Sequence, residues 1–204
     1  MNNYKDIITE SFVAKLLKEL NGIGITTYNI ECIMLEGSSL YLNNFNDLDF
    51  KIIVKRYFPK AETLKCFEID GYTVECCYYT NQDWSKVMNY KKDAHYIMES
   101  PDMICVYGDD SNFYRYDTSN KSIQRYVLNI FDKYFFNYDA KRKGTYQMKD
   151  KRLWNFLLFA FKVKNESNAL SSAQIEKMQK AHDGDLTKAD CKYLFDELKE
   201  IIYG

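Results

Sequence analysis

The segments that favour β-strands in this 204-residue chain all lie before residue 109, and the rest of the chain favours helices. Apolar runs rich in β-branched and aromatic residues predict strands at 28–37, 48–58, 62–69, 72–79 and 102–108. Helical periodicity predicts helices at 4–20, 80–98, 119–137, 150–164, 172–181 and 187–202. We therefore expect an α+β fold with a small mixed or antiparallel sheet and flanking helices, followed by an all-helical C-terminal region.

The change of character near residue 118 predicts two domains, 1–117 and 118–204. Asp70-Gly71 separates two apolar runs in the first domain, and both residue types tolerate the positive φ of a two-residue hairpin turn. The runs 62–69 and 72–79 are therefore predicted to be antiparallel neighbours. Thr80, followed three positions later by Asp83, predicts the start of the helix at 80–98.

The composition and charge of the chain favour some classes of protein over others. The hydrophobic content of 46% supports a packed core, and the formal net charge of −1 removes the simplest argument for a nucleic-acid binder. The six cysteines show no CxxC spacing, the N-terminus MNNYKDIITES has no apolar signal core, and no apolar run reaches the length of a membrane span. We expect a cytoplasmic protein with no membrane partner; its oligomeric state is left open.

Two acids open the second predicted strand. Asp47 and Asp49 are separated by one residue, so their side chains share a face of the strand. Two carboxylates this close require a cation or a raised pKa. Hard oxygen ligands at this spacing suit Mg²⁺, with Mn²⁺ as the alternative. Asp47 and Asp49 are therefore candidate metal ligands and catalytic residues.

A third acid and a Gly-Ser turn extend this candidate site. Glu75 lies inside the apolar run YTVECC; if that strand neighbours the strand of Asp47 and Asp49, three carboxylates converge as in two-metal phosphoryl or nucleotidyl transfer. Glu75 is thus a third candidate metal ligand and catalytic residue, able to orient or deprotonate an attacking hydroxyl. The turn Gly37-Ser38-Ser39 offers backbone N–H groups and hydroxyls that can bind phosphate.

These motifs resemble the signature of the DNA polymerase β nucleotidyltransferase superfamily. Leu35-Glu36-Gly37-Ser38, Asn46-Asp47-Leu48-Asp49-Phe50 and Val74-Glu75-Cys76 match its Gly-Ser turn, its paired acids and its later third acid. The resemblance implies a nucleotidyltransferase sheet and a metal-dependent enzyme that transfers an NMP from an NTP to an acceptor hydroxyl and releases pyrophosphate. Residues 149–187 also resemble the C-terminal helices of predicted nucleotidyltransferases that include RNA-repair-associated members.

Basic residues precede the helix that contains Trp154. Within this cluster, Lys149 and Arg152 are candidate nucleotide-binding residues, because a triphosphate needs cations beyond the metal. The alternative is a solvated basic loop. His95 and His182 have no partners in sequence that complete a catalytic or metal set, and neither is nominated.

Three functional interpretations remain open at this stage. The first is the active enzyme, whose acceptor is an RNA end, a small molecule or a protein. The second is a catalytically inactive regulator or antitoxin-like binding protein with the same fold, suggested by the short spacer between Ser38 and Asp47. The third is an α/β interaction domain in which Asp47, Asp49 and the turn residues only cap local backbone.

Overall fold

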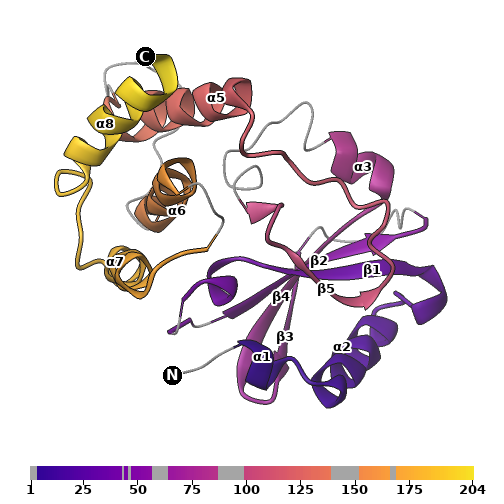
Figure 1. Ribbon diagram of the computed structural model, residues 1–204. Helices are drawn as coiled ribbons and strands as arrows, with labels where there is room; N and C mark the ends of the chain where they lie inside the picture. The colour runs from indigo at the N-terminus through magenta and orange to yellow at the C-terminus, as the bar shows by residue number, and fades with distance from the viewer. Residues whose placement is uncertain are drawn as a thin grey trace. The chain divides into compact units, whose positions relative to one another are not determined.

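The computed structural model describes residues 4–42, 44–45, 47–56, 64–86, 99–138, 152–165 and 169–204. The chain forms two compact units, Met1–Arg115 and Tyr116–Gly204 (Figure 1). The first unit contains a sheet with helices, and the described part of the second unit is helical. The chain is thus a mixed α/β protein whose strands precede its helical region, as the sequence predicts.

The sheet of the first unit has five strands in the order β3-β4-β2-β1-β5. Their bounds are Ile30–Glu36 for β1, Asp47–Val54 for β2, Leu64–Ile69 for β3, Tyr72–Tyr79 for β4 and Ile104–Gly108 for β5. β2 and β4 run parallel, and the other neighbouring pairs are antiparallel. The sheet is therefore mixed, and each predicted strand is present; where both ends lie among the described residues, they differ from the prediction by a few positions.

The predicted hairpin is confirmed. β3 and β4 pair antiparallel, with Ile69 opposite Tyr72, and the two residues between them form the turn. Asp70 has a φ of 53° and Gly71 a φ of 83°. Both values lie in the left-handed region, which these two residue types enter at the lowest cost.

One face of the sheet packs against helix α2, Glu10–Gly22 (Figure 1). Phe12, Leu16 and Leu20 are buried here in one cluster with Phe50 and Ile52 of the sheet. The single helix predicted for 4–20 is wrong, because the chain breaks between α1, Tyr4–Ile7, and α2. Thr9 causes the break: its hydroxyl accepts a hydrogen bond from the Phe12 N–H at 3.2 Å, so it caps a new helix.

The opposite face of the sheet is polar at one end and aromatic at the other. The side chains of Asp47, Asp49 and Lys51 lie on this face, because alternate residues of β2 share a side. Trp84 of α3, Asn81–Lys86, is fully buried and stacks on Phe113 with 5.3 Å between ring centroids. The remainder of the helix predicted for 80–98 lies outside the described residues.

Helix α3 starts as the sequence predicts. The Thr80 hydroxyl accepts a hydrogen bond from the Asp83 N–H at 3.1 Å and donates one to the Asp83 carboxylate at 2.8 Å. This local cap fixes the direction in which the chain leaves β4.

The described part of the second unit contains helices and their connections, and no strand. The helices are α5 (Lys121–Phe131, continued by a π-helical turn at Asp132–Phe136), α6 (Leu153–Lys164), α7 (Ser172–Asp183) and α8 (Lys192–Tyr203). The apolar stripe of α6 is core, since its residues from Leu153 to Phe161 are all buried. None of the described helices combines the length and apolar character that crossing a bilayer requires.

The helix predicted at 187–202 starts later than expected, at Lys192. The Asp190 carboxylate accepts hydrogen bonds from the Thr187 N–H at 2.8 Å and the Thr187 hydroxyl at 2.7 Å. These bonds hold residues 187–190 in a turn before the helix, which is the preference of Asp and Thr over a helix interior.

Replacement of two glycines should separate the effect of the hairpin turn from the effect of adding a methyl group. A Cβ added at Gly71 or at Gly22 meets no atom within 4 Å, but only Gly71 has a positive φ. We expect Gly71→Ala to lower the free energy of unfolding by about 1–2 kcal/mol. Gly22→Ala, at the end of α2, should leave it unchanged or raise it by up to about 1 kcal/mol. Urea denaturation measures both; equal effects would contradict the turn assignment.

Candidate functional site

Three carboxylates form one row across the sheet. In the register of the strands, Glu36 of β1 is opposite Asp49 of β2, and Asp49 is opposite Glu75 of β4. Like charges directly opposite each other on neighbouring strands are destabilising. The row therefore needs a compensating cation or proton.

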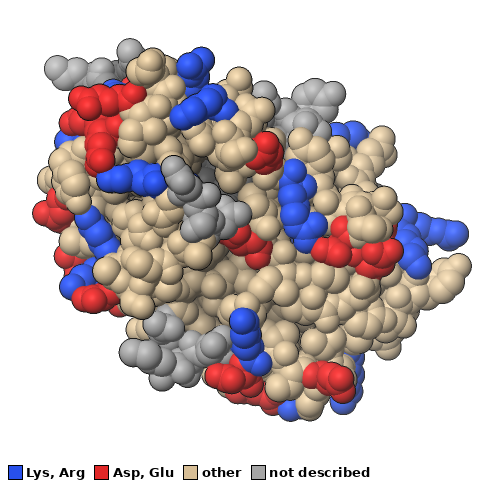
Figure 2. Space-filling view, viewed as in Figure 1, with Lys and Arg blue, Asp and Glu red and all other residues tan. Residues whose placement is uncertain are grey.

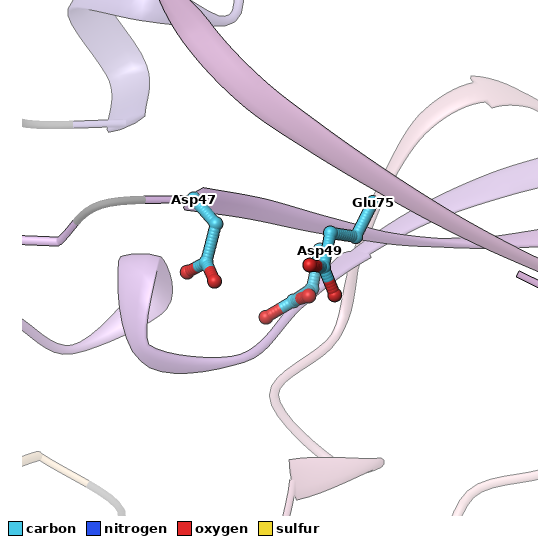
Figure 3. Close-up of side chains that lie close together, drawn as sticks. All are labelled: Asp47, Asp49 and Glu75. Atoms are coloured by element: carbon cyan, nitrogen blue, oxygen red, sulfur yellow. The ribbon is translucent and has the colours of Figure 1, made fainter. Parts of the chain in front are cut away.

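Asp47 adds a fourth acid, two residues along β2 on the same face. Carboxylate oxygens of Asp47, Asp49 and Glu75 lie within 4.8 Å of one another. Figure 3 shows the carboxylates of Asp49 and Glu75 side by side, with that of Asp47 on the same side of the strand. The parallel pairing of β2 and β4 brings together these acids, which the sequence places 26 residues apart from Asp49 to Glu75.

The buried, negatively charged surroundings shift the pKa of Asp49. Burial is the main cause that raises the pKa of its carboxyl to about 8. Nearby negative charges raise this pKa further, in the order Asp47, Glu36, Glu99 and Glu75. A divalent cation at the cluster would counteract this shift, because it favours the ionised form of each carboxyl.

The Gly-Ser turn lies directly against Asp49. Gly37 has a φ of 82°, and a side chain at this position would overlap with the Asp49 carboxylate. Ser38 and Ser39 follow in a short 3-10 turn, Ser38–Leu40, and both are buried. The Ser39 hydroxyl donates to the Glu36 carbonyl at 3.3 Å, whereas among the described residues the Ser38 hydroxyl has no hydrogen-bond partner.

A segment that sequence reasoning did not nominate closes over this turn. The Gly37 N–H donates to the carboxylate of Glu99 at 3.2 Å, and Glu99 is fully buried. The Tyr41 hydroxyl donates to Asp102 at 2.7 Å. One of the backbone donors proposed for phosphate is therefore bonded to a carboxylate of the chain itself. Nothing in the sequence pattern relates Glu99 to Gly37, because they are 62 residues apart.

A buried ion pair that was not predicted from the sequence lies beside the acids. Lys51 of β2 is fully buried, and its ammonium lies 2.8 Å from the Glu36 carboxylate. The available signal was a lysine inside the apolar run DLDFKIIV, two residues after Asp49 and hence on the same face of the strand.

The basic residues nominated from the sequence lie elsewhere in the chain. Arg152 immediately precedes α6 in the second unit, and Lys149 lies outside the described residues. Of the two histidines, His95 is also outside them, and His182 lies against the Trp154 ring, 6.5 Å between centroids. The role predicted for Lys149 and Arg152 stays a prediction.

The donor set fits a hard divalent cation. Its members are carboxylates, which Mg²⁺ and Mn²⁺ prefer as ligands. One further oxygen, Oε2 of the buried Glu36, has no hydrogen-bond partner among the described residues. Burial of an unpartnered carboxylate oxygen is costly, so a group that would satisfy it is expected.

Comparison with protein-family models and with curated proteins finds no match to this chain.

Replacement of Gly37 should disturb the site as well as the backbone. Gly37→Ala introduces the backbone strain expected for Gly71→Ala and, in addition, an overlap with Asp49. We expect it to lower the free energy of unfolding by about 2–5 kcal/mol, the sum of the backbone strain and the overpacking. Urea denaturation of the two variants side by side tests this; a loss no larger than that of Gly71→Ala would show that the turn does not press on Asp49.

The raised pKa of Asp49 predicts a pH dependence of stability in metal-free buffer. The folded chain keeps the Asp49 proton up to about pH 8, whereas an unfolded chain releases it near pH 4. Between these values the folded state binds the extra proton, so its stability falls as the pH rises. Asp49→Asn replaces the titrating carboxyl group with a neutral amide. The melting temperature of this variant should exceed that of the wild type at pH 9 but not at pH 4.

Thermal unfolding in a chelating buffer from pH 4 to pH 9 measures the difference. Asp6→Asn, at an exposed position of α1, is the control and should follow the wild-type profile. Parallel profiles for the wild type and Asp49→Asn would be evidence against the raised pKa.

Proposed function

We propose that this chain is a nucleotidyltransferase that uses Mg²⁺ or Mn²⁺ to move an NMP from an NTP to an acceptor hydroxyl. One observation carries the proposal: carboxylate oxygens of Asp47, Asp49 and Glu75 lie within 4.8 Å of one another, beside a Gly-Ser turn that contacts Asp49. A cation site next to backbone and hydroxyl donors is suited to a substrate that carries phosphates.

In the proposed reaction the acceptor oxygen forms a bond to the α-phosphorus of the NTP. The bond from that phosphorus to the oxygen that bridges to the β-phosphate breaks, and pyrophosphate leaves. The proton of the acceptor hydroxyl passes to a carboxylate, for which Glu75 is our candidate because it lies beside Asp49 on the neighbouring strand. When bound, the divalent cation supplies charge neutralisation at the phosphates.

Each of the chain's own residues has a separate task in this proposal. Asp47 and Asp49 hold the cation from one strand, so their spacing is set by the pleat of β2. Ser38, whose hydroxyl makes no hydrogen bond within the described residues, binds a phosphate oxygen with Gly37 and Ser39 beside it. The role predicted for Lys149 and Arg152 as cationic partners of a triphosphate rests on the sequence alone.

The acceptor is proposed only as a class of hydroxyl. On the face drawn in Figure 2, Lys and Arg side chains are interspersed with Asp and Glu. Together with the net charge of −1, this mixture favours a small molecule, a protein side chain or a single RNA end over an extended nucleic-acid surface.

A catalytically inactive regulator is the second candidate function. It is favoured by the hydrogen bond of 3.2 Å from the Gly37 N–H to the Glu99 carboxylate, which takes up a donor that the enzyme would direct at phosphate. A regulator of this kind needs neither metal-dependent NTP binding nor pyrophosphate release.

Transfer of label from an α-labelled NTP tests the enzyme directly. With Mg²⁺ or Mn²⁺ and a pool of RNA ends, small hydroxyl compounds and proteins, we expect the wild type to label an acceptor and to release pyrophosphate. Asp49→Ala should reduce both by about 10²-fold to 10³-fold, because it removes a ligand of the cation that neutralises the phosphates. Glu19→Gln, an exposed charge change on α2, is the control and should retain wild-type transfer.

Titration calorimetry separates the two candidates. If the chain is the proposed enzyme, the wild type binds NTP only when the divalent cation is present. Asp49→Ala should then lose this metal-dependent binding. Full label transfer by Asp49→Ala would rule out the proposed site, whereas a wild type that binds no NTP in Mg²⁺ or Mn²⁺ would favour the regulator.

A further inference from the structure

The buried pair Glu36–Lys51 is a feature that the proposed chemistry does not use. Glu36 is 6% exposed and Lys51 is 0% exposed, with 2.8 Å between the ammonium and the carboxylate oxygen Oε1. The ammonium also lies 5.3 Å from the Tyr79 ring centroid and 5.5 Å from that of Trp84. The Lys51 ammonium therefore lies close to one carboxylate and to two aromatic rings.

This pair is a poor source of stability. Taking two charges out of water is costly for each ion, and their attraction offsets this cost only with good geometry and further hydrogen bonds. Replacement of such a pair by apolar groups of similar volume is often neutral or stabilising. We therefore explain this buried pair by the place where it holds the Glu36 carboxylate, beside the other acids, and not by a gain in stability.

The geometry directs Glu36 toward the acids. Its strand position is directly opposite Asp49, and alternation along β1 places its side chain on the face that contains Asp49 and Lys51. The Lys51 ammonium lies 2.8 Å from one carboxylate oxygen of Glu36, Oε1. The other, Oε2, is buried and has no hydrogen-bond partner among the described residues. A buried acceptor thus lies one strand away from the candidate cation ligands.

Mg²⁺ and Mn²⁺ supply a partner for such an acceptor. Mg²⁺ in proteins keeps several of its waters, and each water presents two donors. Carboxylates that accept hydrogen bonds from the ligand shell orient it and contribute to metal affinity. Glu36 is not one of the acids whose oxygens gather within 4.8 Å, so it is suited to act through a water rather than by direct ligation.

We propose that Glu36 is a positioning residue of the cation site: its free oxygen accepts a hydrogen bond from a water of the cation bound by Asp47, Asp49 and Glu75. Lys51 holds the Glu36 carboxylate in place and neutralises part of the negative cluster. This inference rests on the cation site of the proposed function, and it adds a fourth carboxylate and a buried lysine to that site.

Mn²⁺ binding in the absence of nucleotide tests the inference without reference to activity. Electron paramagnetic resonance of free Mn²⁺ at constant pH gives the dissociation constant for each variant. We expect Glu36→Gln to bind Mn²⁺ about 10-fold to 100-fold more weakly than the wild type, the range for loss of an outer-shell partner. Glu31→Gln makes the same charge change on the same strand, outside the acid cluster, and should change the constant less than about twofold.

The double variant Glu36→Gln with Lys51→Met separates a positioning role from a purely structural one. Glu36→Gln alone leaves a buried ammonium without its carboxylate and is expected to be unstable. The double variant removes one charge of each sign, so the net charge of the site is unchanged. We expect a melting temperature close to that of the wild type, together with Mn²⁺ binding weakened by about 10-fold or more.

The outcomes separate the positioning role of Glu36 from the cation site itself. A folded double variant with wild-type Mn²⁺ affinity would show that the pair is only structural and would overturn the inference alone. If the double variant does not fold, Glu36→Asp takes its place, since it keeps the charges but withdraws the oxygen; unchanged affinity would again overturn the inference. A wild type that does not bind Mn²⁺ would overturn the cation site itself, and with it the proposed function.

Discussion

Repulsion among carboxylates is the constraint on which the first unit depends. Glu36, Asp49 and Glu75 are opposite one another on three adjacent strands, and Asp47 is two residues away on the same face. Sheets normally avoid like charges in this arrangement. The strand pairing that gives the unit its core on one face therefore assembles, on the other face, a cluster that is stable only with a compensating positive charge.

The chain itself neutralises one of these carboxylates, Glu36, but offers no paired cation to Asp49 among the described residues. Lys51 neutralises Glu36 from within the sheet, at 2.8 Å and out of contact with solvent. Asp49 instead bears a pKa raised to about 8, which means that the folded chain holds a proton there at neutral pH. The apolar core under α2 offsets this local cost within the same unit.

Much of the fold was predictable because its signals are local. The hairpin at Asp70-Gly71 follows from two residue types that tolerate positive φ, and the cap at Thr80 follows from a side chain that reaches the N–H three residues on. The same local chemistry explains the two errors. Thr9 and Asp190 each have a side chain that bonds nearby backbone, so each interrupts a segment whose apolar periodicity alone predicts one continuous helix.

The candidate site was likewise predictable only in part. From the sequence it follows that Asp47 and Asp49 share a face, because side chains alternate along any strand, and that Glu75 is an unusual residue in its apolar run. Three contacts are visible only in the folded chain: Glu75 lies beside Asp49, Glu36 lies opposite Asp49, and the Gly37 N–H donates to Glu99. Strand order and register decide these contacts, and they result from the packing of distant segments, which no local pattern encodes.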